Sequence, residues 1–277
     1  MNTMAKQNSV NVRCKFLCCA VLASFCCADC VAALRPYAAV GPAVPVSVKD
    51  ALPKVPAEVI EKMQEAGAIV VRRGGRVVGF DFNDSEVTDQ QLSALANVRG
   101  VTDLSFERTG ITDKGIAHLV GVRDLEWLNL YESKVGDDAL KHLAKIKAIK
   151  FLPIGKTKVT DKGLAYLKDM KQLQYLGLRG NQIADKGIAH LKNLTQLTGL
   201  HLGETQITDA ALPHLKRMVN LKELWLSQTR ITNASAPALS EFKKLEKLSL
   251  IITRMTSVGV QQVRKALPVC DVRYERE

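Results

Sequence analysis

Residues 197–207 read LTGLHLGETQI, and this arrangement of apolar and small residues recurs along most of the chain at a spacing of 24 residues. Leu197, Leu200 and Leu202 form a triad at spacings of three and two, and Ile207 follows ten residues after the first of them, ahead of Thr and Asp. With small variations, the apolar-Thr-Asp group returns without an insertion at 87–89, 111–113, 135–137, 159–161, 183–185, 207–209, 231–233 and 255–257. The triads run from Val77, Phe80 and Phe82 to Val269, Val272 and Tyr274, which gives nine strand-like segments. A repeat of this length is typical of a stacked solenoid.

Each repeat has a strand half and a helical half. The triad predicts a short strand whose second and third apolar residues, such as Leu128 and Leu130, point to one side. The Thr-Asp pair predicts a helix start, and the apolar column of that helix, for example Leu140 and Leu143, faces the same interior. One repeat cannot bury this face alone, so the repeats must stack. Apolar residues make up 47% of the chain and aromatic residues only 5%, which favours a core of aliphatic layers.

The repeat resembles the leucine-rich-repeat family, whose unit reads L-x-x-L-x-L-x-x-N-x-L before a variable helical half. It is most similar to the 24-residue repeats of bacterial exported and surface proteins. Where the family has asparagine, this chain has a small hydrogen-bonding residue at Ser85, Thr109, Ser133, Thr157, Asn181, Thr205, Thr229 and Thr253. Such side chains can satisfy the buried turns of the backbone. The resemblance covers residues 77–277 and implies an α/β horseshoe, with a parallel sheet on the concave face and short helices on the convex face.

The ends of this core need caps. Residues 57–66 (AEVIEKMQEA) predict an amphipathic helix, and residues 68–80 predict a hairpin with its turn at Arg72–Arg76. Residues 57–76 are therefore assigned to an N-terminal cap and residues 77–277 to the solenoid. A final strand over Leu267–Val272 is expected to close the C-terminal end.

Residues 1–34 predict an export signal or a membrane anchor. Lys6, Arg13 and Lys15 precede an unbroken apolar run of thirteen residues at 16–28, and Asp29 ends that run before it reaches the length of a membrane span. Six of the seven cysteines lie in this segment, so the remainder, with Cys270 alone, is expected to hold no internal disulfide. Residues 35–56 contain five of the nine prolines and predict an extended linker.

Partners of such a fold are expected on the outward positions of the strands. Trp127, Phe151 and Tyr175 occupy one slot on three successive strands, which predicts an aromatic ladder facing solvent beside a glycine-floored trough. Exposed aromatic residues near arginine dominate interface energetics, although such rows can also simply cover the sheet. The residues proposed to bind a partner are Trp127, Tyr131, Phe151, Tyr175, Arg179, His201 and Trp225. An acidic end of the same face comprises Asp81, Asp84, Asp103 and Glu107, which could bind Ca²⁺ but more often form a solvated face.

Catalytic and cofactor motifs are absent from the sequence. No nucleophile stands in a recognisable elbow or triad, and there is no phosphate-binding glycine loop. His118, His142, His190 and His214 share one position of the repeat, which explains them better than metal ligation. The formal charge of +11 comes largely from lysines at helical positions. This charge indicates solubility or attraction to an anionic envelope or glycan.

The sequence therefore predicts an exported, monomeric, non-catalytic module that binds a protein and takes no cofactor, metal or nucleic acid. Its expected location is secreted, periplasmic or at the cell surface, anchored only if the N-terminal segment is retained. One alternative is a structural envelope protein that binds polysaccharide. Another is a substrate-recognition subunit similar to the repeat proteins of ubiquitin ligases, although no F-box-like segment precedes the repeats.

Overall fold

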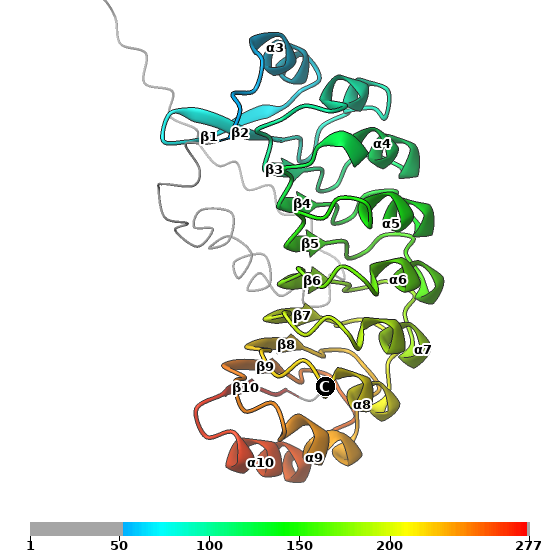
Figure 1. Ribbon diagram of the computed structural model, residues 1–277. Helices are drawn as coiled ribbons and strands as arrows, with labels where there is room; N and C mark the ends of the chain where they lie inside the picture. The colour runs from blue at the N-terminus through cyan, green and yellow to red at the C-terminus, as the bar shows by residue number, and fades with distance from the viewer. Residues whose placement is uncertain (1–51, 276–277) are drawn as a thin grey trace, which may run out of the picture. The chain divides into compact units, whose positions relative to one another are not determined.

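Ten strands form a single sheet in which chain neighbours pair in the order β1 to β10. The computed structural model describes residues 52–275. The first two strands are antiparallel, and every later pair is parallel. Figure 1 shows the strands along one side of the stack and the helices along the other. The predicted α/β solenoid, with its sheet on the concave face and short helices on the convex face, is confirmed.

Each strand of the solenoid is short, and so is each helix. The strands are β1 (Ile69–Arg73), β2 (Arg76–Asp81), β3 (Asp103–Ser105), β4 (Trp127–Asn129), β5 (Phe151–Pro153), β6 (Tyr175–Gly177), β7 (Gly199–His201), β8 (Glu223–Trp225), β9 (Lys247–Ser249) and β10 (Asp271–Arg273). The helices are α3 (Ala57–Glu65), α4 (Asp113–His118), α5 (Asp137–Leu143), α6 (Asp161–Leu167), α7 (Asp185–Ile188), α8 (Leu212–Leu215), α9 (Ala236–Leu239) and α10 (Ser257–Ala266). 3₁₀ turns supplement them at Gln91–Leu95, Leu119–Gly121, Ala189–Leu191, Asp209–Ala211 and Asn233–Ser235.

The leucine triads form the core, as predicted. Leu128 and Leu130 are fully buried, and so are Leu140 and Leu143 from the helix that follows them. The equivalent residues of the next repeats are equally buried, so one aliphatic column runs between sheet and helices. Because each repeat buries its apolar face only against its neighbours, the stack is the unit of stability.

Small polar residues satisfy the turn after each strand. Thr109, Thr205 and Thr229 each donate a hydroxyl hydrogen bond to the carbonyl three residues earlier, at 2.8, 2.6 and 2.6 Å. Asn181 reaches further, because its Nδ2 donates to the Ile154 carbonyl of the preceding repeat at 2.8 Å. The expectation that small side chains replace an asparagine ladder is confirmed.

A second ladder joins the helix starts of successive repeats. Thr160 caps its own helix by accepting from the Lys162 N–H, and its own N–H and hydroxyl donate to the carboxylate of Asp137 at 2.8 and 2.7 Å. Asp185 accepts the same pair of bonds from Thr208 at 2.8 and 2.7 Å. Of the Thr-Asp pair that predicts each helix start, the threonine caps its own helix, whereas the aspartate bonds to the following repeat. This aspartate ladder therefore holds each helix start to the next.

A helix and a hairpin lie at the N-terminal end of the sheet. Helix α3 buries Val59 and Met63, and the hairpin β1–β2 continues directly into the parallel sheet by pairing Phe80 with Leu104. The turn of the hairpin is shorter than predicted, because Gly74 and Gly75 both adopt positive φ and close it between Arg73 and Arg76. Glycine is the residue that reaches this conformation without steric cost.

The final strand was predicted too early. Helix α10 extends to Ala266, and the N–H of Cys270 closes a turn on the Leu267 carbonyl, so pairing with β9 begins only at Asp271. Val269, predicted as a core residue, is 85% exposed. Leu267 is buried instead, because it follows the helix into the core before the turn.

Strand β5 departs from its neighbours, as its proline predicts. It pairs with β4 only at Trp127 and Phe151, whereas it pairs with β6 at all three positions. Pro153 lacks the N–H that the ladder would use. The Pro153 carbonyl still accepts from the Leu130 N–H at 2.8 Å, so the sheet remains continuous.

Some predictions fall on residues that are not described. The export segment 1–34 and residues 35–51 of the predicted linker lie outside the described residues, as do the six cysteines of that segment. Cys270 is a free, half-buried thiol whose pKa is raised to about 11, chiefly by burial. None of the helices between residues 52 and 275 combines the length and apolarity needed to cross a membrane.

Candidate binding surface on the concave face

The first and third residues of each strand point away from the core, and the parallel register sets them in rows. Trp127, Phe151 and Tyr175 are direct neighbours across β4, β5 and β6, in the order predicted. The other row passes from Gly177 through His201 to Trp225. The sheet therefore brings five of the seven predicted binding residues onto adjacent strands. Tyr131 and Arg179 follow β4 and β6 by two residues.

The predicted glycine trough is covered rather than open. A Cβ atom added at Gly199 would lie 2.7 Å from the ring of Tyr175, and one at Gly155 would lie 3.0 Å from the ring of Tyr131. Each ring thus lies over a glycine of the next strand. Tyr175 is only 8% exposed, so it does not face solvent as the ladder prediction required. The glycines make space for aromatic rings of the chain itself, while Trp127, Phe151 and Tyr131 remain partly exposed.

Trp225 and His201 extend the aromatic side chains of the concave face beyond Tyr175. We call Trp127, Tyr131, Phe151, Tyr175, His201 and Trp225 together the aromatic half of this face. The ring of Trp225 meets Tyr175 edge-on at 6.3 Å between centroids, and it lies 5.3 Å from the imidazole of His201. Burial lowers the pKa of His201 to about 3, with a smaller contribution from the positive charge of Arg179. His201 is therefore neutral at physiological pH.

Arg179 is part of an ion pair, not a solvent-facing anchor. Its Nε donates to Glu204 at 2.8 Å, and its Nη2 also contacts that carboxylate. The residue is buried beside the aromatic rows. This pair places one fixed positive and one fixed negative charge at the edge of the aromatic half.

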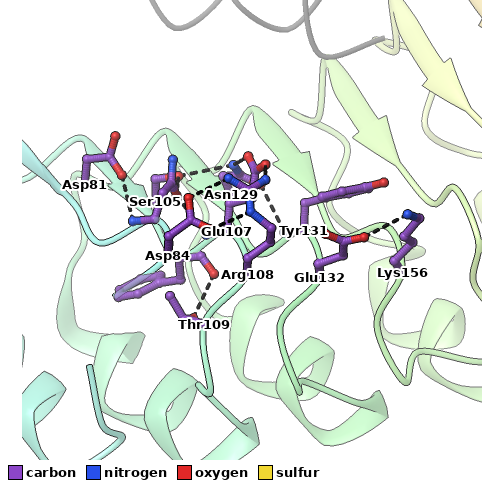
Figure 2. A network of polar contacts seen from close by, with 12 residues as sticks. Asp81, Asp84, Ser105, Glu107, Arg108, Thr109, Asn129, Tyr131, Glu132 and Lys156 are labelled. Atoms are coloured by element: carbon purple, nitrogen blue, oxygen red, sulfur yellow. Dashed lines mark hydrogen bonds and ion pairs between the residues drawn. The ribbon is translucent and has the colours of Figure 1, made fainter. Parts of the chain in front are cut away.

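At the other end, arginines pair with three of the four predicted acidic residues, and Figure 2 shows Arg108 beside Asp84 and Glu107. Arg108 forms two bonds of 2.6 Å with Asp84 and also contacts Glu107. These bonds lower the pKa of Asp84. Arg73 pairs with Asp103 at 2.9 Å, and Asp81 accepts the N–H of Asn83 at 2.9 Å. Within residues 52–275, no group of three acidic, histidine or cysteine side chains is arranged to hold a metal ion.

A chain of amide and hydroxyl groups crosses the same strands, and sequence reasoning missed it. Asn83 accepts from the Ser105 hydroxyl at 2.6 Å and from the Glu107 N–H at 2.8 Å. Asn129 donates to Ser105 at 3.1 Å and to Glu107 at 3.0 Å (Figure 2). The signal was present, because Asn83, Glu107 and Asn129 stand at equivalent or adjacent outward positions of three repeats. We call these residues, together with Asp81, Asp84 and Asp103, the polar end of the concave face.

A row of left-handed residues also escaped the sequence analysis. It follows the strands at one position of every repeat, namely Asp84, Arg108, Glu132, Lys156, Gly180, Glu204, Gln228 and Ile252, all with φ between 50° and 70°. Alternating charges in this row pair across repeats, as Lys156 does with Glu132 at 2.8 Å. The Lys156 ammonium also lies 5.7 Å from the ring centre of Tyr131. A β-branched residue such as Ile252 is strained in this conformation.

Solved structures of similar shape include an internalin (inlF) from Listeria monocytogenes, which is 25% identical with a TM-score of 0.59 over 71% of this chain and 53% of its own. The leucine-rich-repeat ectodomain of the Arabidopsis receptor kinase HAESA, in complex with the peptide hormone IDA, is 19% identical with a TM-score of 0.58, over 83% of this chain and 40% of its own. The fold is that of the leucine-rich-repeat solenoids. Internalin C2 (inlC2) of L. monocytogenes has a TM-score of 0.60 at 20% identity, over 85% of this chain and all of its own.

The described leucine-rich-repeat solenoid thus spans about half the length of the internalin inlF chain. No protein-family model matches the sequence. No curated protein matches it either. These neighbours share the leucine-rich-repeat fold with this chain, and the HAESA ectodomain among them was solved with a peptide hormone ligand.

Proposed function

We propose that the chain is an exported, non-catalytic module that binds a protein through the aromatic half of its concave face. The observation that carries this proposal is the in-register row of Trp127, Phe151 and Tyr175, which Trp225 meets at the Tyr175 ring. Trp127, Phe151, Tyr131 and Trp225 are partly exposed. Tryptophan and tyrosine on a preformed surface supply large contact areas with little loss of side-chain freedom. The N-terminal segment of the sequence supports export.

The buried members of this surface support its shape. Tyr175 and His201 pack beneath Trp225 and over the glycines, and the Arg179–Glu204 pair borders them. Their geometry is fixed before a partner arrives, which lowers the cost of ordering on binding. We therefore assign direct contact to Trp127, Phe151, Tyr131 and Trp225, and support to Tyr175, His201 and Arg179.

The polar end would set the orientation of the partner. Asp81, Asp84, Asp103 and Glu107 are held by hydrogen bonds and arginines, so they offer a fixed pattern of charge next to the aromatic half. A polar rim beside an aromatic centre is the usual anatomy of a specific protein interface. The proposal does not depend on which face of the HAESA ectodomain binds its peptide hormone.

The test is affinity capture from a cell-surface extract with the purified chain and two single variants, Trp127→Ala and Trp225→Ala. Wild type should retain a defined protein, and each variant should lose at least tenfold in its recovery, with a melting temperature within a few degrees of wild type. Tyr175→Ala is unsuitable, because removal of a ring packed on two glycines would disturb folding.

The matched control changes exposed apolar residues outside this face. Val219 and Val258 are 61% and 71% exposed. Val219→Ala and Val258→Ala therefore each remove exposed apolar atoms and leave the aromatic half unchanged. They should leave recovery unchanged. Equal recovery by the tryptophan variants and wild type would refute the proposed site.

A further inference from the structure

The convex face carries a second surface, formed by rings and lysines. His118, His142, Tyr166, His190 and His214 occupy one position on five successive helical segments, from α4 to α8. Tyr166 is 41% exposed, His190 is exposed, and the other three are half-buried. These helices follow one another along the outer side of the stack in Figure 1, so the rings form a strip that runs along the solenoid.

Lysines flank this ring strip on both sides. Lys162 and Lys186 lie one helical turn before Tyr166 and His190, and Lys168 and Lys192 lie two residues after them. The exposed lysines of this face are Lys114, Lys141, Lys145, Lys162, Lys168, Lys186, Lys192 and Lys216. We call these lysines and the ring strip together the convex basic strip.

Outside the helix starts, few acidic side chains lie around the strip. No carboxylate of the described chain lies within ion-pair distance of these eight lysines. Helices α4 to α8 contain no glutamate, and Asp138 and Asp169 are the exposed acids beside the strip. The aspartates at the helix starts, such as Asp137 and Asp185, are bonded to the next repeat. These aspartates keep their charge, but their carboxylates bond to threonines and not to the lysines, so the eight ammonium groups are left without a carboxylate partner among the described residues.

Helix stability does not account for all of these lysines. Lys168, Lys192 and Lys216 lie at helix C-termini, where a cation is favourable. Lys114 and Lys162 lie instead in the first turn of α4 and α6, where a cation opposes the helix dipole. Their recurrence at an unfavourable position points to a ligand.

We infer that the convex basic strip binds an acidic polysaccharide that runs along the solenoid. Packed helices lie about 8–10 Å apart, which is on the scale of one disaccharide unit, so each repeat can offer one ring to a sugar face and lysines to a carboxylate or sulfate group. The cations of the strip are lysines, without the arginine forks typical of nucleic-acid recognition. A membrane surface would need more exposed apolar residues than the single Tyr166.

The test measures binding of the purified chain to alginate and to heparin, which carry carboxylate and sulfate groups respectively, with dextran as the neutral comparison. Binding to one or both acidic polymers and not to dextran is expected, with an affinity that falls as salt rises. The strip variant, Lys162→Gln, Lys168→Gln, Lys186→Gln and Lys192→Gln together, should bind at least tenfold more weakly. Tyr166→Ser with His190→Ser should weaken binding severalfold with an unchanged salt dependence.

A control of equal charge separates the strip from net charge. Lys54→Gln, Lys62→Gln, Lys243→Gln and Lys265→Gln together remove four exposed lysines elsewhere and should change affinity by less than threefold. Equal losses in the two quadruple variants would overturn the inference, as would an absence of binding to either acidic polymer. Tighter binding to duplex DNA or to phosphatidylglycerol vesicles than to both polymers would overturn it too. Because the concave face is untouched, these results stand apart from the protein-capture test.

Discussion

His201 shows how one residue of the concave face depends on its repeat neighbours. Glycines at 177, 199 and 203 leave room for rings, and His201 is buried against Trp225, with Arg179 nearby. The residue stands alone in the sequence as a histidine on an outward strand position, so an exposed contact was the natural expectation. Its burial follows from rings whose directions depend on several strands at once.

The lowered pKa of His201 predicts a pH dependence of stability. An unfolded histidine titrates near 6.5, whereas His201 in the folded chain titrates at about 3, so between these values the unfolded state binds more protons. The free energy of unfolding is therefore highest above pH 6.5 and falls as the pH is lowered toward 3. The loss between pH 6.5 and 4.5 should be about 2 kcal/mol, measured by urea unfolding.

His201→Gln is the variant that isolates this effect, because glutamine is polar and does not titrate. Asp84 and Asp124, whose pKa values are lowered, gain protons only at more acidic pH. Stability of the variant should thus be nearly flat between pH 6.5 and 4.5. The same slope in variant and wild type would show that another group is responsible.

Among the elements, several helix starts have a glycine two residues after the aspartate of the repeat, as at Gly115, Gly163 and Gly187. A Cβ atom at Gly187 would lie 2.3 Å from the Asp161 carboxylate oxygen that accepts the Ala184 N–H. Gly163 meets Asp137 at the same distance. The glycine thus fits the close approach of the preceding aspartate. Ala211 and Ser235 stand at the equivalent position in later repeats, where Asp185 and Asp209 still bond to Thr208 and Thr232, so an added Cβ atom must shift the carboxylate.

Gly187→Ala should therefore displace the Asp161 carboxylate and weaken its bond to the Ala184 N–H. We expect a loss of about 1–3 kcal/mol in the free energy of unfolding, measured in urea. Gly110→Ala is the matched control, because its Cβ atom would meet nothing closer than the Lys134 Nζ at 4.0 Å. That control should be neutral or slightly stabilising. Equal effects of both changes would argue against the aspartate ladder as the link between helix starts.

Element positions followed from the 24-residue period wherever the period holds. Strands and helices of the central repeats fall in the expected halves, because every repeat meets the same neighbours. The period misled at its end, where Pro268 and the longer helix α10 replace the usual turn and leave Val269 exposed. A terminal repeat packs against a neighbour on one side only, so some positions that are buried in central repeats face solvent there.

For the whole molecule, the fold could be predicted from the sequence far better than the surface. Leu128 and Leu200 are in the core because strand alternation and stacking leave them no other place. Tyr175 is on the predicted face, yet it lies over Gly199, and that direction depends on a neighbour 24 residues away. Likewise the pairing of Arg108 with Asp84 and Glu107 depends on the row of left-handed residues, which the repeat pattern did not reveal.

The solenoid thus offers two extended faces with different chemistry. The concave sheet carries rings and internally paired charges, and the convex helices carry lysines without carboxylate partners among the described residues. Because both faces belong to one rigid stack, a protein on the inner side and an acidic polymer on the outer side need not compete.

The central claim is that a protein partner contacts the aromatic half of the concave face. The most direct measurement is site-specific photocrosslinking with benzoylphenylalanine placed at Trp127, at Trp225 or at the convex residue Tyr166, followed by mass spectrometry of the adducts. The account predicts the same partner protein at positions 127 and 225 and none at position 166. A partner protein that crosslinks at position 166 and at neither tryptophan position would contradict it.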